Sequence, residues 1–411
     1  MKTNKKLRIV HLQLLPIMSG VQKVALDEMA LIDRNQFEPL LVCKMPGEFT
    51  VAAGKLGIEC RYVEELERAV KPVADLKALY KLYRLFKELR PDVVHTHSSK
   101  TGVLGRIAAK LAGVPAVMHT VHGFSFDGAS SVAQRRLYLG LEWISARFCD
   151  AVLLLKNADL ELTRSALGVR DSKLHLIPNG VSMADFAPGS PELTRVEKRK
   201  LLSCESDEVA IAMTGRLWEQ KNPECFVHAA IEVLEKGAQK VRFYLIGDGP
   251  LRDNLQQMID KSGFSEQIKI LGWRNDVKAL LRVMDVFVLP SRWEGLPLAI
   301  LEAMSTGLPV IASNIPGNND LVKEGITGYL FEREKHSALV DKLMLLLVDA
   351  DKRHQFGLAA RTSVFEHYQI ENRVSKIEKL YTRLLNQDGL PRLDESVHQQ
   401  EGKKSGRTAV Q

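Results

Sequence analysis

The sequence of 411 residues has no hydrophobic run near the roughly 20 residues that a membrane-spanning helix needs. Its first apolar stretch, residues 11–16, is too short and too interrupted for a signal peptide, so we expect the protein to stay in the cytoplasm. Cysteine is scarce: five residues, scattered and without the paired spacing of a zinc site, are predicted to be reduced and mostly buried thiols.

Charge and length narrow the class of protein further. The net charge of +7 is mild, which fits anionic substrates or an anionic membrane face but is too diffuse to indicate nucleic-acid binding. A chain of 411 residues with 45% hydrophobic content is too long for one core and predicts two domains of about 200 residues each.

Strand and helix patterns alternate along the chain, which is typical of parallel sheets covered by helices. In the first half the strand patterns are 7–15, 39–43, 57–63, 92–95, 116–119 and 151–155, with helical patterns at 23–31, 75–90, 102–111 and 134–146. In the second half the strand patterns are 209–213, 241–246, 268–271, 286–289 and 310–312, with helical patterns at 277–284, 298–304 and 339–347 and one long helical pattern at 365–385.

A proline- and glycine-rich segment, 188–191, separates the two series of strands and predicts a linker. We therefore expect an N-terminal domain at 1–190, a second domain at 191–365, a C-terminal helix at 366–386 and a disordered polar tail at 387–411.

Polar residues follow the first-half strands, where parallel strands end and ligands bind. His122 is the strongest histidine candidate because Gly123 lets it approach a ligand, whereas His95 and His97 are interpreted as structural. A zinc site from His95, His97 and His119 is disfavoured, because no carboxylate or cysteine lies at a useful spacing. Gly20 follows the first strand, without the Gly-x-Gly-x-x-Gly fingerprint of a dinucleotide site.

Two cations follow the first strand of the second half. Arg216 and Lys221 lie in a loop that begins with Gly215, and they suit a diphosphate, with arginine as a planar fork and lysine as a point charge. The alternative is a pair of surface cations without a ligand.

The segment 290–313 reads as loop, helix and strand, with Glu294 in the loop and Glu302 about one turn into the helix. The free backbone N–H groups and the dipole of the helix favour an anion between the two carboxylates. A nucleotide sugar has these parts, because its diphosphate lies between a ribose and a hexose, whose hydroxyls the two carboxylates would bind. The alternative is that both glutamates are ordinary solvated residues.

The helical pattern at 75–90 is amphipathic and basic. Leu76, Leu79, Tyr83 and Phe86 form an apolar stripe apart from the lysines and arginines, which predicts either a core-packed helix or a helix lying on anionic lipid.

These motifs together resemble the retaining family-4 glycosyltransferases, of the kind that build bacterial surface polysaccharides. The resemblance covers about residues 7–385, and its specific part is the ordered set 215–222, 247–250 and 294–309. It implies the GT-B architecture, in which two facing Rossmann-like domains enclose a deep cleft, and a C-terminal helix that returns to the first domain.

The resemblance also implies the role of each site residue. Arg216 and Lys221 bind the donor diphosphate, Glu302 holds the ribose and Glu294 contacts the transferred sugar. His122 lies against that sugar from the first domain. The remaining substrate-binding positions are Gly20, Gly272, Trp273, Arg274, Gly295, Leu296 and Leu298. Ser19 and Gln22 depart from the usual pattern around Gly20.

The predicted function is sugar transfer with retention from a nucleotide sugar, with UDP as the expected nucleotide, to a saccharide acceptor, lipid-linked by expectation. No metal or other cofactor is expected, because arginine and lysine would stabilise the leaving group. Peripheral contact with an anionic membrane is an accompanying hypothesis. The alternatives are a nucleotide-sugar epimerase of similar fold and a non-catalytic sugar-binding subunit.

Overall fold

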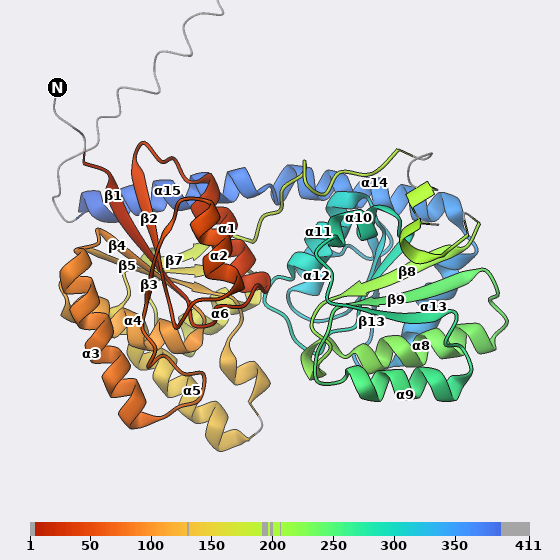
Figure 1. The fold of residues 1–411 in the computed structure, drawn as a ribbon, viewed down its shortest axis with the longest axis horizontal. Helices are drawn as coiled ribbons and strands as arrows, with labels where there is room; N and C mark the ends of the chain where they lie inside the picture. The colour runs from red at the N-terminus through yellow and green to blue at the C-terminus, as the bar shows by residue number, and fades with distance from the viewer. Residues whose placement is uncertain (1–4, 130, 191–195, 198–199, 206, 388–411) are drawn as a thin grey trace, which may run out of the picture.

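The computed structural model describes residues 5–129, 131–190, 196–197, 200–205 and 207–387. Two separate parallel sheets, each flanked by helices, form two domains that lie side by side (Figure 1). The predicted architecture of two Rossmann-like domains is confirmed. Of the predicted tail at 387–411, residue 387 is the last residue of a helix, contrary to the prediction. Residues 388–411, and residues 191–195, 198–199 and 206 around the predicted linker, lie outside the described residues.

The first sheet has seven parallel strands in the order β3-β2-β1-β4-β5-β6-β7. The strands are Leu7–Leu12 (β1), Phe37–Cys43 (β2), Glu59–Tyr62 (β3), Val93–His97 (β4), Ala116–Val121 (β5), Ala151–Leu154 (β6) and Leu174–Leu176 (β7). The helices are Gly20–Leu31 (α1), Glu48–Lys55 (α2), Pro72–Leu89 (α3), Ser99–Leu111 (α4), Val132–Ser145 (α5) and Asn157–Ser165 (α6). One face of this sheet packs on α3 and α4.

The second sheet has six parallel strands in the order β10-β9-β8-β11-β12-β13. They are Val209–Thr214 (β8), Val241–Ile246 (β9), Ile268–Gly272 (β10), Val286–Leu289 (β11), Val310–Ser313 (β12) and Gly328–Phe331 (β13). The helices are Pro223–Glu235 (α8), Arg252–Ser262 (α9), Val277–Arg282 (α10), Leu298–Thr306 (α11), Asn318–Leu321 (α12), His336–Leu347 (α13) and Ala350–His367 (α14). Separate apolar clusters fill the two faces of the sheet.

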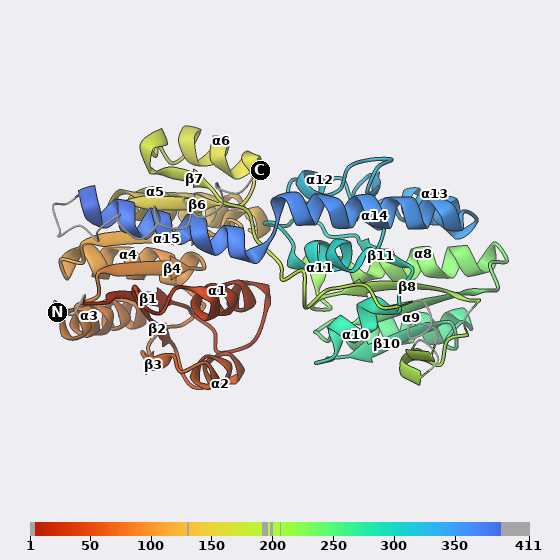
Figure 2. The same ribbon diagram turned by 90° about the horizontal axis from the view of Figure 1, so that it is seen from above.

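The single helix predicted at 365–385 is wrong, because the chain forms α14 and then α15 (Ile370–Gln387). Between them the backbone pairs with Val181, whose N–H donates to the carbonyl of Tyr368 at 2.9 Å and whose carbonyl accepts from the N–H of Ile370 at 3.2 Å. Those bonds replace helical ones. α15 then returns to the first domain, as predicted (Figure 2). Its Tyr381 is buried in the apolar cluster on that domain's sheet.

Each strand order reverses direction at one point, between β1 and β4 in the first sheet and between β8 and β11 in the second. Ligands of open parallel sheets bind beyond the carboxyl ends of the strands at such a point. The residues that follow these four strands are therefore the ones to inspect for a site.

Two local predictions need correction. The strand predicted at 92–95 extends to His97, because β4 continues its pairing with β5 as far as that residue. The predicted apolar stripe of α3 is also only partly buried. The core face uses Ala78, Leu82, Phe86 and Leu89, whereas Leu76 is 68% exposed. This helix therefore carries more apolar surface than the core uses.

All five cysteines are free thiols, and all but Cys60 are buried, as predicted. Within the part of the chain that the structure describes, no helix is both long and apolar enough to cross a membrane.

Candidate active site

The loop between β11 and α11, residues 290–297, contains a buried carboxylate. Glu294 is 7% exposed, and its Oε1 accepts hydrogen bonds from Lys221 Nζ at 2.5 Å and from Ser291 Oγ at 2.7 Å. The structure thus brings together two residues that are 73 positions apart and that the sequence assigned to one site. The Lys221 ammonium offsets the charge of the carboxylate where both are largely removed from water.

The other predicted cation of the second domain is exposed. The Arg216 guanidinium lies 5.0 Å from the ring centre of Trp218. Arg68, from the first domain, lies 5.7 Å from the same ring. Gly215, at φ +143°, leaves room for Lys221, because a Cβ there would lie 3.3 Å from Lys221 Cε. One cation of this loop is thus paired with a carboxylate, and the other faces solvent.

Glu302 lies about one turn into α11, as predicted, and is partly buried. Burial raises the pKa of its carboxyl group to about 7, although Lys23 of the first domain opposes that shift. Among the described residues nothing forms a hydrogen bond or an ion pair with this carboxylate, so its oxygens remain available. The first backbone N–H groups of α11 also lack partners within the helix.

The first domain approaches the 290–297 loop very closely. A Cβ at Gly295 would lie 2.3 Å from the carbonyl oxygen of His122, so only glycine fits there. On the same side, a Cβ at Gly20 would lie 4.0 Å from Leu298 Cδ1. The predicted residues of both domains therefore meet at the carboxyl ends of the two sheets.

Sequence reasoning missed two residues of the first domain that bind this loop. Lys156 Nζ donates to the Glu294 carbonyl at 2.5 Å, and Asn179 Nδ2 donates to the Leu296 carbonyl at 2.7 Å. Both side chains are buried. They follow β6 and β7, so a search for polar residues after every strand would have found them.

The predicted segment 272–274 lies at the same edge of the second sheet, but β9 and β8 separate its strand from β11. Gly272 has φ +69°, and its carbonyl accepts from the N–H of Gly247 at 2.8 Å. Trp273 is 56% exposed. Arg274 forms two bonds with Asp276, at 2.7 and 2.5 Å, so its charge is already balanced.

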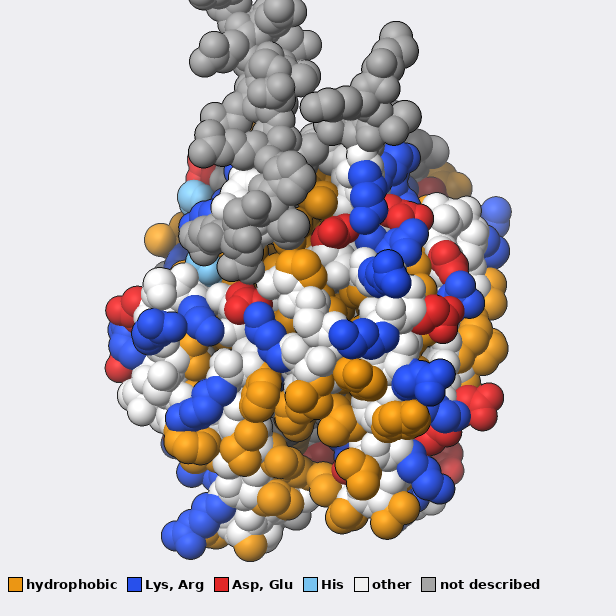
Figure 3. Space-filling model, turned by 90° about the vertical axis from the view of Figure 1, so that its left-hand side faces the viewer, with side chains coloured by type: hydrophobic (Ala, Val, Ile, Leu, Met, Phe, Trp, Pro, Cys, Tyr) orange, Lys and Arg blue, Asp and Glu red, His pale blue; other side chains and the backbone are white. Residues whose placement is uncertain are grey.

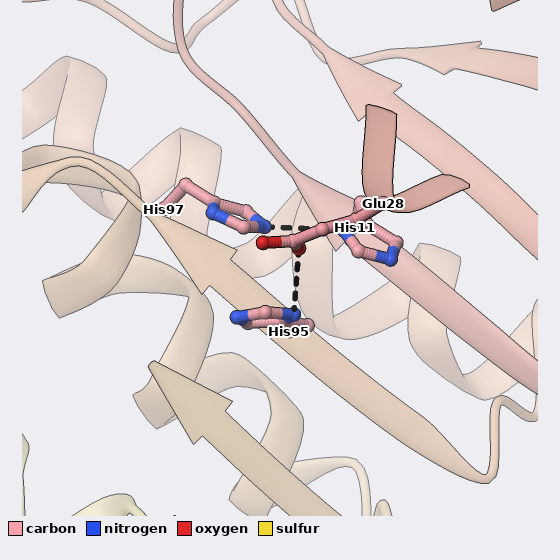
Figure 4. Close-up of side chains that lie close together, drawn as sticks. All are labelled: His11, Glu28, His95 and His97. Atoms are coloured by element: carbon pink, nitrogen blue, oxygen red, sulfur yellow. Dashed lines mark hydrogen bonds and ion pairs between the residues drawn. The ribbon is translucent and has the colours of Figure 1, made fainter. Parts of the chain in front are cut away.

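Figure 4 shows a cluster of three buried histidines, His11, His95 and His97. His97 Nδ1 is 3.0 Å from His122 Nε2, and His97 Nε2 is 3.1 Å from His11 Nδ1. His95 is satisfied separately by the Tyr381 hydroxyl at 2.8 Å and the Thr120 hydroxyl at 2.7 Å, in keeping with its predicted structural role.

The residues of this cluster differ from the zinc set weighed from the sequence. Glu28, which that reasoning missed, lies with one ligand atom each of His11, His95 and His97 in a group whose atoms are all within 4.8 Å of one another. His119 instead bonds the Thr96 hydroxyl at 2.9 Å.

The chemistry of the cluster does not fit a dication. Arg373 already neutralises Glu28 through contacts of 2.7 and 2.8 Å, and both nitrogens of His95 have partners. A divalent ion would therefore add two unbalanced charges to a buried site.

Family models match both halves of the chain. Residues 19–180 match the glycosyl transferase 4-like domain, and residues 195–363 match the glycosyl transferases group 1. The chain is also 40% identical over 381 residues to the UDP-Gal:alpha-D-GlcNAc-diphosphoundecaprenol alpha-1,3-galactosyltransferase of Escherichia coli, covering 92% of this chain and 97% of that protein. The chain therefore belongs to the family of glycosyltransferases to which these two models and this relative belong.

Two further matches are more distant in sequence from this chain. It is 25% identical, over 87% of its length and 93% of the relative, to the N,N'-diacetylbacillosaminyl-diphospho-undecaprenol alpha-1,3-N-acetylgalactosaminyltransferase of Campylobacter jejuni. The Anabaena Alr3699/HepE structure in complex with UDP and glucose has a TM-score of 0.79 at 21% identity, covering 92% of this chain and 100% of that chain, which supports the GT-B fold. Membership of this family favours transfer over the epimerase and binding-subunit alternatives.

Proposed function

We propose that this glycosyltransferase moves a hexose from a UDP-sugar to a saccharide carried on a polyprenyl diphosphate, with retention and without a metal ion. The observation that carries the proposal is the meeting of the Lys221–Glu294 pair with His122 and Gly295 where both sheets end. UDP-galactose is the first donor to test, because the Escherichia coli relative is named for it.

In this proposal Arg216 and Lys221 hold the diphosphate, while Glu294 and Glu302 bind hydroxyls of the sugar and the ribose. The exposed guanidinium, the Lys221 ammonium and the unpartnered Glu302 carboxylate support these roles. Gly295, Leu296 and Leu298 are proposed to meet the phosphates through their backbone, with Gly20 opposite, where a Cβ would lie 4.0 Å from Leu298 Cδ1. Gly272, Trp273 and Arg274 are proposed to line the nucleotide end, Trp273 through its exposed ring.

The proposed reaction breaks the bond between the sugar carbon and the phosphate oxygen. Lys221, Arg216 and the N-terminus of α11 stabilise the charge that develops on the leaving diphosphate. The acceptor hydroxyl attacks the same face of the sugar and gives its proton to a phosphate oxygen. The configuration is retained, and no protein nucleophile is needed.

The polyprenyl part of the proposal is supported by an apolar surface on the first domain. Leu76, Leu79, Tyr80, Tyr83 and Leu111 line a groove between α3 and α4. The nearby lysines and arginines of α3 are exposed. Hydrophobic side chains gather on this side of the molecule among lysines and arginines (Figure 3). Apolar residues with a basic rim suit the headgroup region of an anionic bilayer, so we propose peripheral binding at the inner face of the membrane.

The reaction is tested by incubating the protein with UDP-galactose and a lipid carrying GlcNAc diphosphate, then weighing the product by mass spectrometry. The expected result is a mass increase of one hexose, unchanged by EDTA, and an α linkage by the anomeric proton coupling in the NMR spectrum of the product. UDP-glucose, UDP-GlcNAc and UDP-GalNAc are the parallel donors. Conversion of the donor in the absence of acceptor, or no transfer from any UDP-sugar, would overturn the proposal.

Membrane binding is tested by pelleting with vesicles that contain anionic phospholipid. Leu76→Glu combined with Tyr80→Glu should abolish pelleting, because the charges would enter the bilayer interface. The matched control is Val348→Glu, which changes a residue of the second domain that is 81% exposed and should leave pelleting intact. Equal pelleting of the two variants would refute this docking surface.

A further inference from the structure

The histidines behind the site form a single file. His122, after β5, bonds to His97 at the end of β4, and His97 bonds to His11 in β1, at 3.0 and 3.1 Å. His97 and His11 are 0% and 1% exposed, whereas His122 is only partly buried and its backbone carbonyl lies against Gly295 of the second domain. The file therefore runs from the candidate active site into the core of the first domain.

Removal of the rings from water favours the neutral form of all three. It lowers the pKa of His122 and His11 to about 3 and that of His97 well below its usual value. Glu28, which lies beside His11 and His97, forms an ion pair with Arg373. A neutral imidazole carries one N–H, so His97 can donate in only one of its two bonds and must accept in the other. Both hydrogen bonds consequently point the same way.

The unpartnered ring nitrogen at the inner end of the file indicates the direction of the two hydrogen bonds. His11 Nε2 is buried and has no partner among the described residues. If the bonds ran inward, this atom would be an unpaired N–H, which is rarer in protein interiors than an under-satisfied acceptor. If they run outward, His11 donates to His97 and His97 donates to His122 Nε2, so the proton of His122 lies on Nδ1.

We propose that His97 is a positioning residue that fixes His122 in the neutral form protonated at Nδ1. The N–H at the outer end of the file then donates to a hydroxyl oxygen of the bound sugar. This last step rests on the proposed function, whereas the protonation state itself is a property of the free protein. A preset donor needs no reorganisation when the sugar arrives, which favours the reaction.

The first test compares two replacements of His97. His97→Phe removes both hydrogen bonds and should lower kcat about tenfold or more, with a smaller change in KM for the donor. His97→Gln should restore most of that loss, because its amide can accept from His11 and donate to His122. The matched control is His95→Gln, on the same strand and equally buried but not bonded to His122, which should lower thermal stability without lowering kcat.

A double-mutant cycle separates positioning from folding. In a His122→Ala background, His97→Phe should cost no further kcat, because the residue through which it acts is gone. Additive losses in the cycle would mean that His97 is merely structural and would overturn the proposal.

The second test needs no activity. Nitrogen-15 spectra of histidine-labelled free protein should show His122 protonated at Nδ1 alone, and a mixture of both forms in His97→Phe. Protonation of His122 at Nε2 in the native protein would overturn the proposal, as would a stoichiometric metal in the purified protein. Failure to transfer sugar with a correct spectrum would instead count against the proposed function alone.

Discussion

Replacing Gly295 by alanine tests whether the two domains must close to the observed distance for catalysis. An alanine Cβ would lie 2.3 Å from the carbonyl oxygen of His122, well below the 3.0 Å that real Cβ contacts respect. Gly295 does not have a positive φ, so alanine strains only the contact between the domains. His122 and residue 295 must therefore move apart by about 1 Å to reach ordinary contact. A displacement of that size between reacting groups costs about 100-fold in rate.

The assay is kcat/KM for sugar transfer together with thermal unfolding. Gly295→Ala should lower kcat/KM by about two orders of magnitude while the melting temperature changes little, because neither domain core is altered. Gly54→Ala is the control, since a Cβ there meets nothing within 4 Å. Activity of Gly295→Ala within about twofold of the native protein would refute the reasoning, because the contact would then not limit the active geometry.

Three further predictions concern buried charges. Glu294→Gln should lower kcat/KM by about 100-fold or more, because it removes the carboxylate that faces the sugar, whereas UDP affinity by calorimetry should not fall, because the Lys221 ammonium loses its carboxylate partner and stays available to the diphosphate. Burial raises the pKa of Glu302 from 4.5 to about 7, so the folded protein keeps a proton that the unfolded chain releases. The free energy of unfolding therefore falls as the pH rises through that window, and Glu302→Gln should remove this fall, measured as melting temperature at pH 5 and pH 8. Arg373→Met leaves the buried carboxylate of Glu28 unpaired and should cost about 3–5 kcal/mol in urea unfolding, part of which a second change, Glu28→Gln, should restore.

The fold was predictable because its strands are short apolar runs separated by helical patterns. Such an alternation of strands and helices is compatible with few topologies. The long pattern at 365–385 misled for a physical reason: nothing in residues 368–370 signals that their backbone pairs with Val181, far away in sequence. The apolar stripe of α3 failed similarly, because the helix has more apolar residues than its core face needs. In both places the local sequence does not reveal which residues the rest of the protein contacts.

The residues of the candidate site likewise divide into those that the sequence predicts and those that it does not. Lys221 and Glu294 could be assigned to one site because each follows a strand at the point where ligands of parallel sheets bind, and topology then brings them together. Lys156 and Asn179 also follow strands, but what they bind is two backbone carbonyls of the other domain, and carbonyls carry no sequence signature.

His97 could not have been assigned to a file of imidazoles from spacing alone. Its partners lie on β1 and after β5, and whether three rings on different elements touch depends on the register of the sheet, in which His11 pairs with His95 rather than with His97. The sequence therefore predicts which edge of each domain is functional. The close approach of Gly295 to His122, by contrast, depends on how one domain docks on the other, which the sequence does not reveal. Gly295→Ala and the double-mutant cycle through His97 therefore test the two contacts that the sequence could not predict.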